Sequence, residues 1–192
     1  MRGAERGAAG PGPALLRGVA LAWGLAEAVL FFVIPDVWIT WVALHGLRRG
    51  LAAAAWTLAG ALAGGLAVYL AARSNQMLVL AVFDRLPAIG DALMLRALAQ
   101  MQEHGWLGLV LGGFSGVPYK LFAAMAEGAG LGMGVFLAAT AVARGLRFAA
   151  FALAAWLLAR WLRPRIGLAR VRALLLGCWA LGYTLYWALM PE

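Results

Sequence analysis

The sequence predicts an all-α integral membrane protein. The chain has 192 residues, of which 65% are hydrophobic and 12% charged, and its mean hydropathy is +0.86. A soluble domain of this size keeps roughly 30% of its unfolded-chain surface exposed and cannot conceal so much apolar surface. The apolar residues form long runs with arginines at their ends, as is typical of membrane proteins. We therefore expect one membrane domain over 14–192, after a disordered tail over 1–13 that is rich in glycine, proline and alanine.

Two of the apolar regions are interrupted by proline. Region 18–46 is broken at Pro35, and region 106–132 is broken at Pro118. The limb before the second break, 106–114, would be about 14 Å long as a helix. That length cannot cross a hydrocarbon core of roughly 30 Å. We predict that both regions are re-entrant hairpins, which enter the membrane and return to the side from which they came.

The other apolar regions are continuous and predict membrane-spanning helices over 51–72, 135–159 and 173–190. The first of these would be about 33 Å long, which is enough to span. A basic linker, 160–172, joins the second and third spans. The segment 73–105 has charges that sum to zero, and from Asp91 onward its apolar residues recur at helical spacing: Leu95, Leu98 and Met101. This spacing predicts either an amphipathic helix at the membrane surface or a helix packed on the outside of the bundle.

The distribution of arginine predicts the topology, because positive charge accumulates on the cytoplasmic side. The three basic sites are the N-terminus, the pair Arg48 and Arg49, and the linker 160–172. All three fall on one side only if both broken regions return without crossing. The neutral segment 73–105 then lies outside. The N-terminus would be cytoplasmic and the C-terminus external.

This layout predicts an internal repeat. The first unit is a hairpin (18–46) followed by a transmembrane helix (51–72), and the second is a hairpin (106–132) followed by a transmembrane helix (135–159). The hairpins enter from opposite faces, so the two units are inverted, and a last C-terminal transmembrane helix follows them. Inverted repeats with broken helices are a transporter architecture. Broken backbone is tolerated at membrane depth only against protein or a wet cavity, so a cavity is expected between the hairpin tips.

Ionisable residues inside the apolar regions mark the candidate site. There are three acids and three bases: Glu27, Asp36, Glu127, Lys120, Arg144 and Arg147. A charged side chain at the bilayer centre costs roughly 2.5–3.5 kcal/mol on insertion scales, so such residues usually line a protected cavity or path. We expect the candidate substrate and proton pathway to contain these residues except Glu127, together with the two prolines at the breaks, Pro35 and Pro118. Glu127 is expected at the outer interface.

Each candidate has a functional and a structural interpretation. Glu27 could titrate protons, or it could only pair with a buried base. Asp36 could share that role or cap the following short helix. Lys120 could neutralise a lipid phosphate or balance the acids. Arg144 and Arg147 are three residues apart and lie on one helix face, where they could contact substrate or pair with the acids.

Other classes of function have little support in the sequence. The basic charge of +8 lies at the ends of apolar runs, which argues against a nucleic-acid face. Cys178 is the single cysteine, and His45 and His104 are isolated, so neither a disulfide framework nor a metal or cofactor site is expected. Ser115 lacks catalytic partners, so no enzyme activity is expected. Tyr183, Tyr186 and most tryptophans are interpreted as interfacial anchors.

Four sequence pieces, in order, resemble the DedA family, the bacterial branch of the VTT-domain (SNARE-associated Golgi protein) superfamily. They are Glu27 followed by Phe31-Phe-Val-Ile-Pro-Asp36, the glycine-rich stretch 60–72, Phe114-Ser-Gly-Val-Pro-Tyr-Lys120, and Ala143-Arg-Gly-Leu-Arg-Phe148. The resemblance covers about residues 18–160 and is closest to the short, YqaA-like members.

The resemblance implies a bacterial inner-membrane protein with two facing re-entrant hairpins. It implies movement of a lipid-linked anion, such as undecaprenyl phosphate or a phospholipid, or of a small solute, with a dependence on protons. The acidic pair of the family matches Glu27 and Asp36, and its basic residue after the second proline matches Lys120. A homo-oligomer is left open. The alternative is a membrane scaffold or assembly protein whose buried charges only lock the hairpins.

The chain departs from the family pattern at both breaks. Many members have Pro-Gly in each hairpin, whereas here Asp36 follows Pro35 and Tyr119 follows Pro118. The basic position is lysine, which lacks the planar fork with which arginine binds phosphate. The identity of the phosphate carrier is therefore left open.

Overall fold

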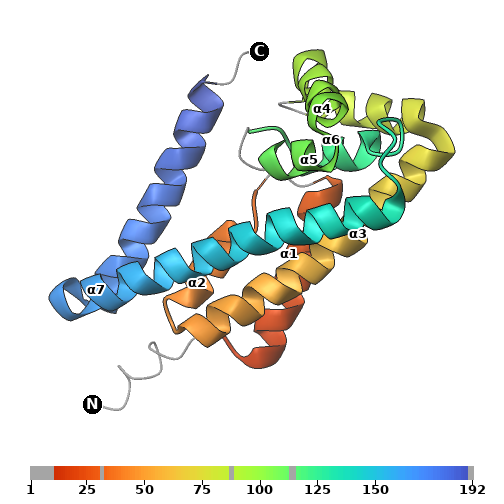
Figure 1. Ribbon diagram of the computed structural model, residues 1–192. Coiled ribbons are helices and arrows are strands. Elements are labelled where there is room, and N and C mark those ends of the chain that lie inside the picture. Colours follow the sequence, from red (N-terminus) through yellow and green to blue (C-terminus); the bar gives the residue numbers. More distant parts are fainter. Residues whose placement is uncertain (1–10, 31–32, 87–88, 113–115, 190–192) are drawn as a thin grey trace.

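The structure, a computed structural model, describes residues 11–30, 33–86, 89–112 and 116–189, and within these ranges its regular secondary structure is all helical (Figure 1). The helices are α1 (Pro13–Val29), α2 (Asp36–Ala43), α3 (Leu47–Asp84), α4 (Asp91–His104), α5 (Trp106–Gly112), α6 (Tyr119–Met125) and α7 (Met133–Leu189). Two of them, α3 and α7, are long and apolar enough to cross a membrane, which is consistent with membrane association. Residues 1–10 of the tail predicted over 1–13 lie outside the described residues.

The first proline break separates α1 from α2. Helix α1 ends at Val29, and α2 begins at Asp36, immediately after Pro35. The start of α1 and the end of α2 belong to one apolar cluster, in which Leu16 is buried together with Val42. The two limbs of the broken region therefore begin and end at the same end of the molecule.

Helices α1 and α3 pack closely because glycines occupy their crossing. A Cβ atom on Gly60 would lie 2.1 Å from the carbonyl oxygen of Leu21, and one on Gly24 would lie 2.1 Å from the carbonyl oxygen of Thr57. No side chain fits in either space, so the backbones themselves are in contact. The small residues of α3 thus set how deeply α1 sits against it.

Helix α3 continues beyond its predicted end. The expected span is 51–72, but the helix extends to Asp84 with a kink at Asn75, whose backbone angles are φ −156° and ψ 87°. The Asn75 side-chain oxygen accepts a hydrogen bond of 3.0 Å from the backbone N–H of Leu78, as an N-cap residue does. The neutral segment 73–105 therefore contains the end of α3 as well as α4.

Helix α4 matches the helix expected from Asp91 onward, and of its predicted apolar positions Met101 is buried and Leu98 packs on the core, whereas Leu95 does not. Met101 and Ala97 are buried, whereas Leu95 is exposed. Residues four apart share a helix face, while residues six apart, such as Leu95 and Met101, do not. The face that packs on the bundle is therefore set by Ala97 and Met101.

Helix α7 runs through the predicted linker. The spans expected over 135–159 and 173–190 are parts of one helical segment, and 160–172 is helical except at Gly167, whose φ is +78°. Glycine adopts this backbone conformation without a Cβ clash, so the chain can turn sharply there. Figure 1 shows the blue part of α7 turning back at the lower left and running upward.

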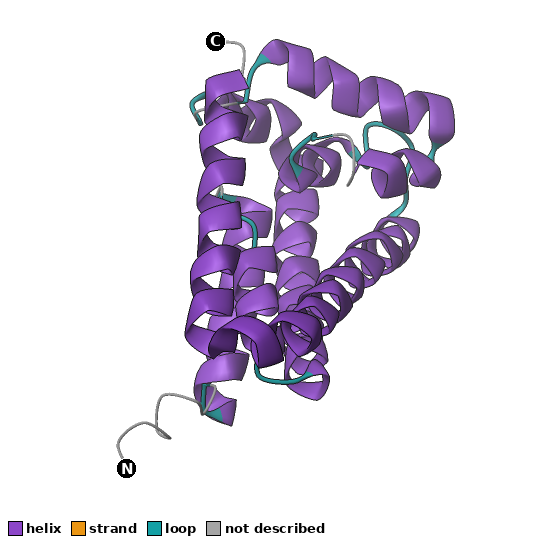
Figure 2. Cartoon of the chain, turned by 90° about the vertical axis from the view of Figure 1, so that its left-hand side faces the viewer, coloured by secondary structure: helices purple, strands orange, loops and turns teal. Residues whose placement is uncertain are grey.

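The basic residues gather at the end where α7 turns. The loop between α2 and α3 packs against this turn through Leu44, Ala159 and Val171. Helices α4, α5 and α6 lie at the opposite end, at the upper right of Figure 1, and Figure 2 shows long helices running between the two ends. The neutral segment and the basic linker are thus at opposite ends, which is the arrangement that the charge argument requires.

His45 joins the two chain segments at the basic end. Arg172 Nη2 donates to His45 Nε2 at 2.7 Å, so Nδ1 carries the proton and donates to the carbonyl of Trp41 at 3.2 Å. Burial, and after it the charge of Arg172, lowers the pKa of His45 below its ordinary 6.5. As pH falls, the His45 ring becomes positively charged in the unfolded chain at a higher pH than in the folded chain. Stability from His45 is therefore complete above pH 6.5 and is lost as pH falls through the lowered pKa.

We expect this linkage to appear in melting curves of the detergent-solubilised protein. The loss of melting temperature between pH 7.5 and pH 5.5 should be smaller in His45→Gln than in the native chain. His104→Gln, which alters an exposed histidine at the other end, is the matched control and should keep the native pH dependence. Equal pH dependence in the native chain and His45→Gln would contradict the linkage.

Candidate functional site

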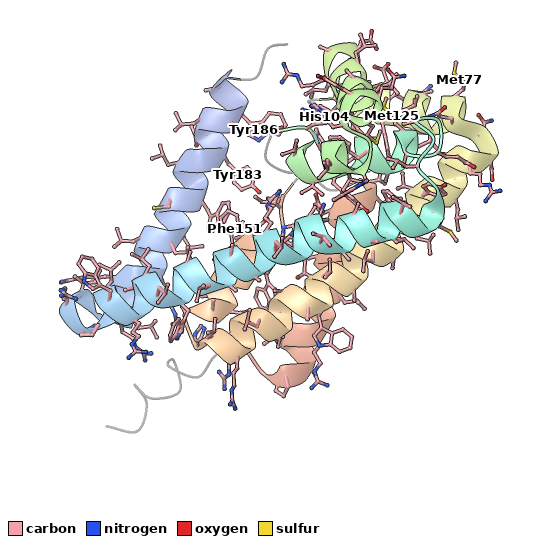
Figure 3. The ribbon with its side chains drawn as sticks, in the orientation of Figure 1. Met77, His104, Met125, Phe151, Tyr183 and Tyr186 are labelled. Atoms are coloured by element: carbon pink, nitrogen blue, oxygen red, sulfur yellow. The ribbon has the colours of Figure 1, made fainter. Side chains whose placement is uncertain are left out.

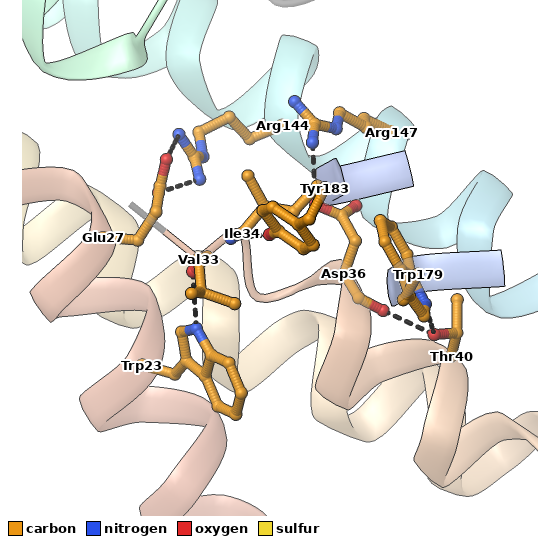
Figure 4. Close-up of polar contacts among 10 residues, drawn as sticks. All are labelled: Trp23, Glu27, Val33, Ile34, Asp36, Thr40, Arg144, Arg147, Trp179 and Tyr183. Atoms are coloured by element: carbon orange, nitrogen blue, oxygen red, sulfur yellow. Dashed lines mark hydrogen bonds and ion pairs between the residues drawn. The ribbon is translucent and has the colours of Figure 1, made fainter. Parts of the chain in front are cut away.

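Two ion pairs, one buried and one partly buried, connect the first broken region to α7 (Figure 4). Arg144 donates to both carboxylate oxygens of Glu27, in the forked geometry that is the strongest form of this interaction. Arg147 Nη2 donates to Asp36 Oδ2 at 2.8 Å. Glu27 is 8% exposed and Asp36 is 0% exposed. Each acid is thus held by a different arginine.

The local sequence explains why the pairs form side by side. Arg144 and Arg147 are three residues apart on α7, so their side chains are neighbours. Glu27 is close to the end of α1, and Asp36 is the first residue of α2. The break between these helices places one acid on each side of it, facing the two arginines.

Asp36 is not the N-cap residue of α2, although as the first residue of that helix its negative charge lies at the positive end of the helix dipole, as expected. Pro35 occupies the N-cap position of α2, and α2 has no side-chain hydrogen bond at its cap. Proline has no side-chain acceptor, and the Asp36 carboxylate is taken up by Arg147. One turn further on, the Thr40 hydroxyl donates to the carbonyl of Asp36 at 2.7 Å, a bond inside the helix that leaves the N-terminal N–H groups unaffected.

The second broken region brings Lys120 to the same place. Helix α6 begins at Tyr119, directly after Pro118, and is buried along its whole length. Lys120 is 2% exposed, and Glu27 is its electrostatic neighbour. The Arg144 guanidinium lies 4.5 Å from the ring centre of Tyr119, a cation–π contact that links the second break to α7.

These elements surround a cavity of about 470 Å³. Its charged lining consists of Glu27, Lys120, Arg144 and Arg147. Its aromatic lining comes largely from α7: Phe151, Trp179, Tyr183 and Tyr186. Figure 3 shows Tyr183 and Tyr186 projecting from the last part of α7 toward the rest of the molecule. The volume is in the range of small-molecule sites, and the lining combines apolar walls with a few charges, as such sites do.

The structure brings most of the predicted site residues together. Four of the five predicted ionisable residues line the cavity, and Asp36 is tied to it through Arg147. Pro118 also lines the cavity, whereas Pro35 is buried at the start of α2 and is not part of the lining. Glu127 lies apart, paired with Arg73 at 3.2 Å on an exposed surface.

The last part of α7 forms one wall of the cavity, which was not predicted from the sequence. The Tyr183 hydroxyl accepts a hydrogen bond of 2.8 Å from the backbone N–H of Ile34, inside the first break. Trp179 Nε1 donates to the Thr40 hydroxyl at 3.1 Å. These contacts give Tyr183 and Trp179 partners inside the molecule, in addition to the interfacial position that was predicted for them. Their spacing of four and three residues, 179, 183 and 186, is the signal that places them on one helix face.

Two polar atoms in the ion pairs have no hydrogen-bond partner among the described residues. They are Asp36 Oδ1 and Arg144 Nε, and both are buried. Buried polar atoms are usually satisfied, so these atoms have capacity left for a further ligand or water. Within the described ranges, no three His, Cys, Asp or Glu side chains gather as metal ligands would.

Comparison of the chain with family models, with curated proteins and with solved structures gave no match.

Proposed function

We propose that the protein is a membrane transporter that moves a lipid-linked anion, such as a polyprenyl phosphate or a phospholipid, or a small anionic solute. The observation that carries the proposal is the cavity lined by Glu27, Lys120, Arg144 and Arg147. Three bases and one acid line it, and even with Asp36 counted the bases exceed the acids by one. Such a cavity suits a ligand with a negatively charged head and an apolar tail, because the aromatic wall offers the tail a surface.

The lengths of the short helices support two re-entrant hairpins. Helices α5 and α6 have 7 residues each and α2 has 8. At about 1.5 Å per residue they reach about 10–12 Å, far less than a hydrocarbon core of roughly 30 Å. In the proposed topology both breaks meet inside the membrane of a bacterial cell, with the basic end cytoplasmic and the C-terminus external.

The ion pairs suggest how protons would be used. An incoming phosphate competes with Glu27 for the Arg144 guanidinium, which binds either oxyanion with the same fork. Protonation of Glu27 removes the negative charge from one partner and releases Arg144 to the substrate. Loss of that proton restores the pair and expels the anion. Alternation of cavity access between these two states would couple transport to protons, whereas equal access from both sides would give passive scrambling.

Reconstitution into liposomes tests this proposal. We expect the native protein to move a polyprenyl phosphate or a phospholipid, and we expect Glu27→Gln and Lys120→Ala each to lower the rate at least about tenfold, a change worth about 1.4 kcal/mol. Glu127→Gln is the matched control, because its carboxylate pairs with Arg73 outside the cavity. Circular dichroism and gel filtration would establish that every variant folds.

A scaffold or assembly role is the second candidate, and the two ion pairs favour it. In that case the charges only lock α1 and α2 against α7. Unchanged lipid movement in folded Glu27→Gln and Lys120→Ala would contradict the transport mechanism and leave the scaffold role.

A further inference from the structure

A second cavity lies at the basic end of the molecule, at the turn of α7. Its volume is about 400 Å³, and its lining combines polar with apolar side chains. The polar ones are His45, Arg160 and Arg163, and the apolar walls include Leu44 and Trp156. This cavity shares no lining residue with the cavity that contains Glu27 and Lys120.

The arginines around this second cavity have no acidic residue close to them in sequence. There is no Asp or Glu between positions 37 and 72 or between positions 128 and 189. These two stretches build the basic end, and Arg160 and Arg163 form no ion pair with any acidic side chain of the described residues. Positive charge gathered in a concave site without acids attracts anions from outside the chain.

The two arginines are arranged to share one anion. They are three residues apart on α7, so their side chains leave the helix on one face. Arg160 lies over the ring of Trp156 at 5.5 Å, which holds the guanidinium at the apolar wall. His45 presents no acceptor to the cavity while its Nε2 accepts from Arg172.

The apolar half of the cavity indicates where the anion comes from. Leu44 and Ala159 form its inner wall, and exposed Leu157, Leu158 and Trp161 follow on the outside of α7. A soluble phosphate would not use this surface, whereas the acyl chains of a lipid would cover it. Basic pockets between transmembrane helices at the cytoplasmic side bind anionic lipid headgroups in this manner.

We propose that the cavity formed by His45, Trp156, Arg160 and Arg163 is a binding site for the phosphate headgroup of an anionic lipid. The site holds a resident lipid of the surrounding leaflet, and it is separate from the cavity proposed for transport. A lipid headgroup bound there would contact both the turn of α7 and the loop between α2 and α3, because residues from both segments line the cavity.

Native mass spectrometry of the detergent-solubilised full chain tests the site with phosphatidylglycerol as the probe and phosphatidylcholine of the same acyl chains as the comparison. We expect selective retention of phosphatidylglycerol. At about fivefold per arginine, the double variant Arg160→Gln/Arg163→Gln should weaken that binding about 25-fold. Arg165→Gln is the matched control, because Arg165 lies on the same segment, donates to the carbonyl of Trp161 and does not line the cavity.

Three outcomes would overturn the proposal. The first is equal retention of the two lipids. The second is a loss of about fivefold in Arg165→Gln, the same loss per arginine as in the double variant, which would indicate general surface charge. The third is displacement of the lipid by glycerol phosphate at the same concentration, which would mean that the site recognises free phosphate. The transport assay of Glu27→Gln and Lys120→Ala uses the other cavity, so either proposal can fail without the other.

Discussion

Replacement of Arg144 by glutamine is expected to lower the free energy of unfolding by about 3–5 kcal/mol. The reason is that the substitution leaves the Glu27 carboxylate buried without its forked partner. Breaking a buried pair from one side is costly because the remaining charge has lost its solvent and its counter-charge. Unfolding of the purified protein in mixed micelles, with SDS as the denaturant, would measure the change.

The double variant Glu27→Gln/Arg144→Gln separates the charge from the packing. It replaces both charges with amides of similar shape, so most of the lost stability should return. Arg73→Gln breaks the exposed pair with Glu127 and should cost about 0–1 kcal/mol. If Arg144→Gln were no more harmful than Arg73→Gln, Arg144 and Glu27 would not form a buried pair in the folded protein.

Replacement of Gly60 by alanine should destabilise the protein by about 1–3 kcal/mol, although alanine is the better helix former. The added methyl group would lie 2.1 Å from the carbonyl oxygen of Leu21 and 2.9 Å from the backbone nitrogen of Leu25. Both are backbone atoms, so α1 must move away from α3 to make room. That movement would also displace Glu27, which α1 carries into the site.

Gly177→Ala is the matched control for this substitution. Gly177 lies on α7 with no atom within 4 Å of the position of a Cβ. Its replacement by alanine should therefore leave the free energy of unfolding unchanged or raise it by at most about 1 kcal/mol, because alanine is the better helix former. Thermal unfolding of both variants in the same detergent measures the contrast. Equal melting temperatures for Gly60→Ala and Gly177→Ala would contradict the close packing of α1 on α3.

The sequence was most informative where physics forces a local choice. Proline inside a helix removes a backbone hydrogen bond and costs about 3 kcal/mol, and helices begin directly after Pro35 and Pro118. Ionisable residues in apolar sequence have few low-cost positions, and Glu27, Lys120, Arg144 and Arg147 meet around one cavity. Neither inference needed knowledge of how the helices pack.

Other features depended on tertiary contacts that no local pattern encodes. The partner of each acid was left open because Glu27 and Asp36 could each reach several bases, and only the seating of α1 and α2 against α7 selects Arg144 and Arg147. The role of Tyr183 was missed because aromatic residues near a chain end have a sufficient explanation at the membrane surface. The helical linker was missed because arginines at the end of an apolar run are typical of both a loop and a continued helix.

The long sequence separation of the ion pairs has a consequence for synthesis of the chain. Arg144 follows Glu27 by 117 residues, and Arg147 follows Asp36 by 111. At about 5–20 residues per second, each acid waits roughly 6–23 s before the ribosome adds its arginine. The Tyr183 hydroxyl that holds Ile34 is 149 residues away and is made later still. During biogenesis the acids of the first broken region must therefore be accommodated without their arginine partners until this part of α7 has been made.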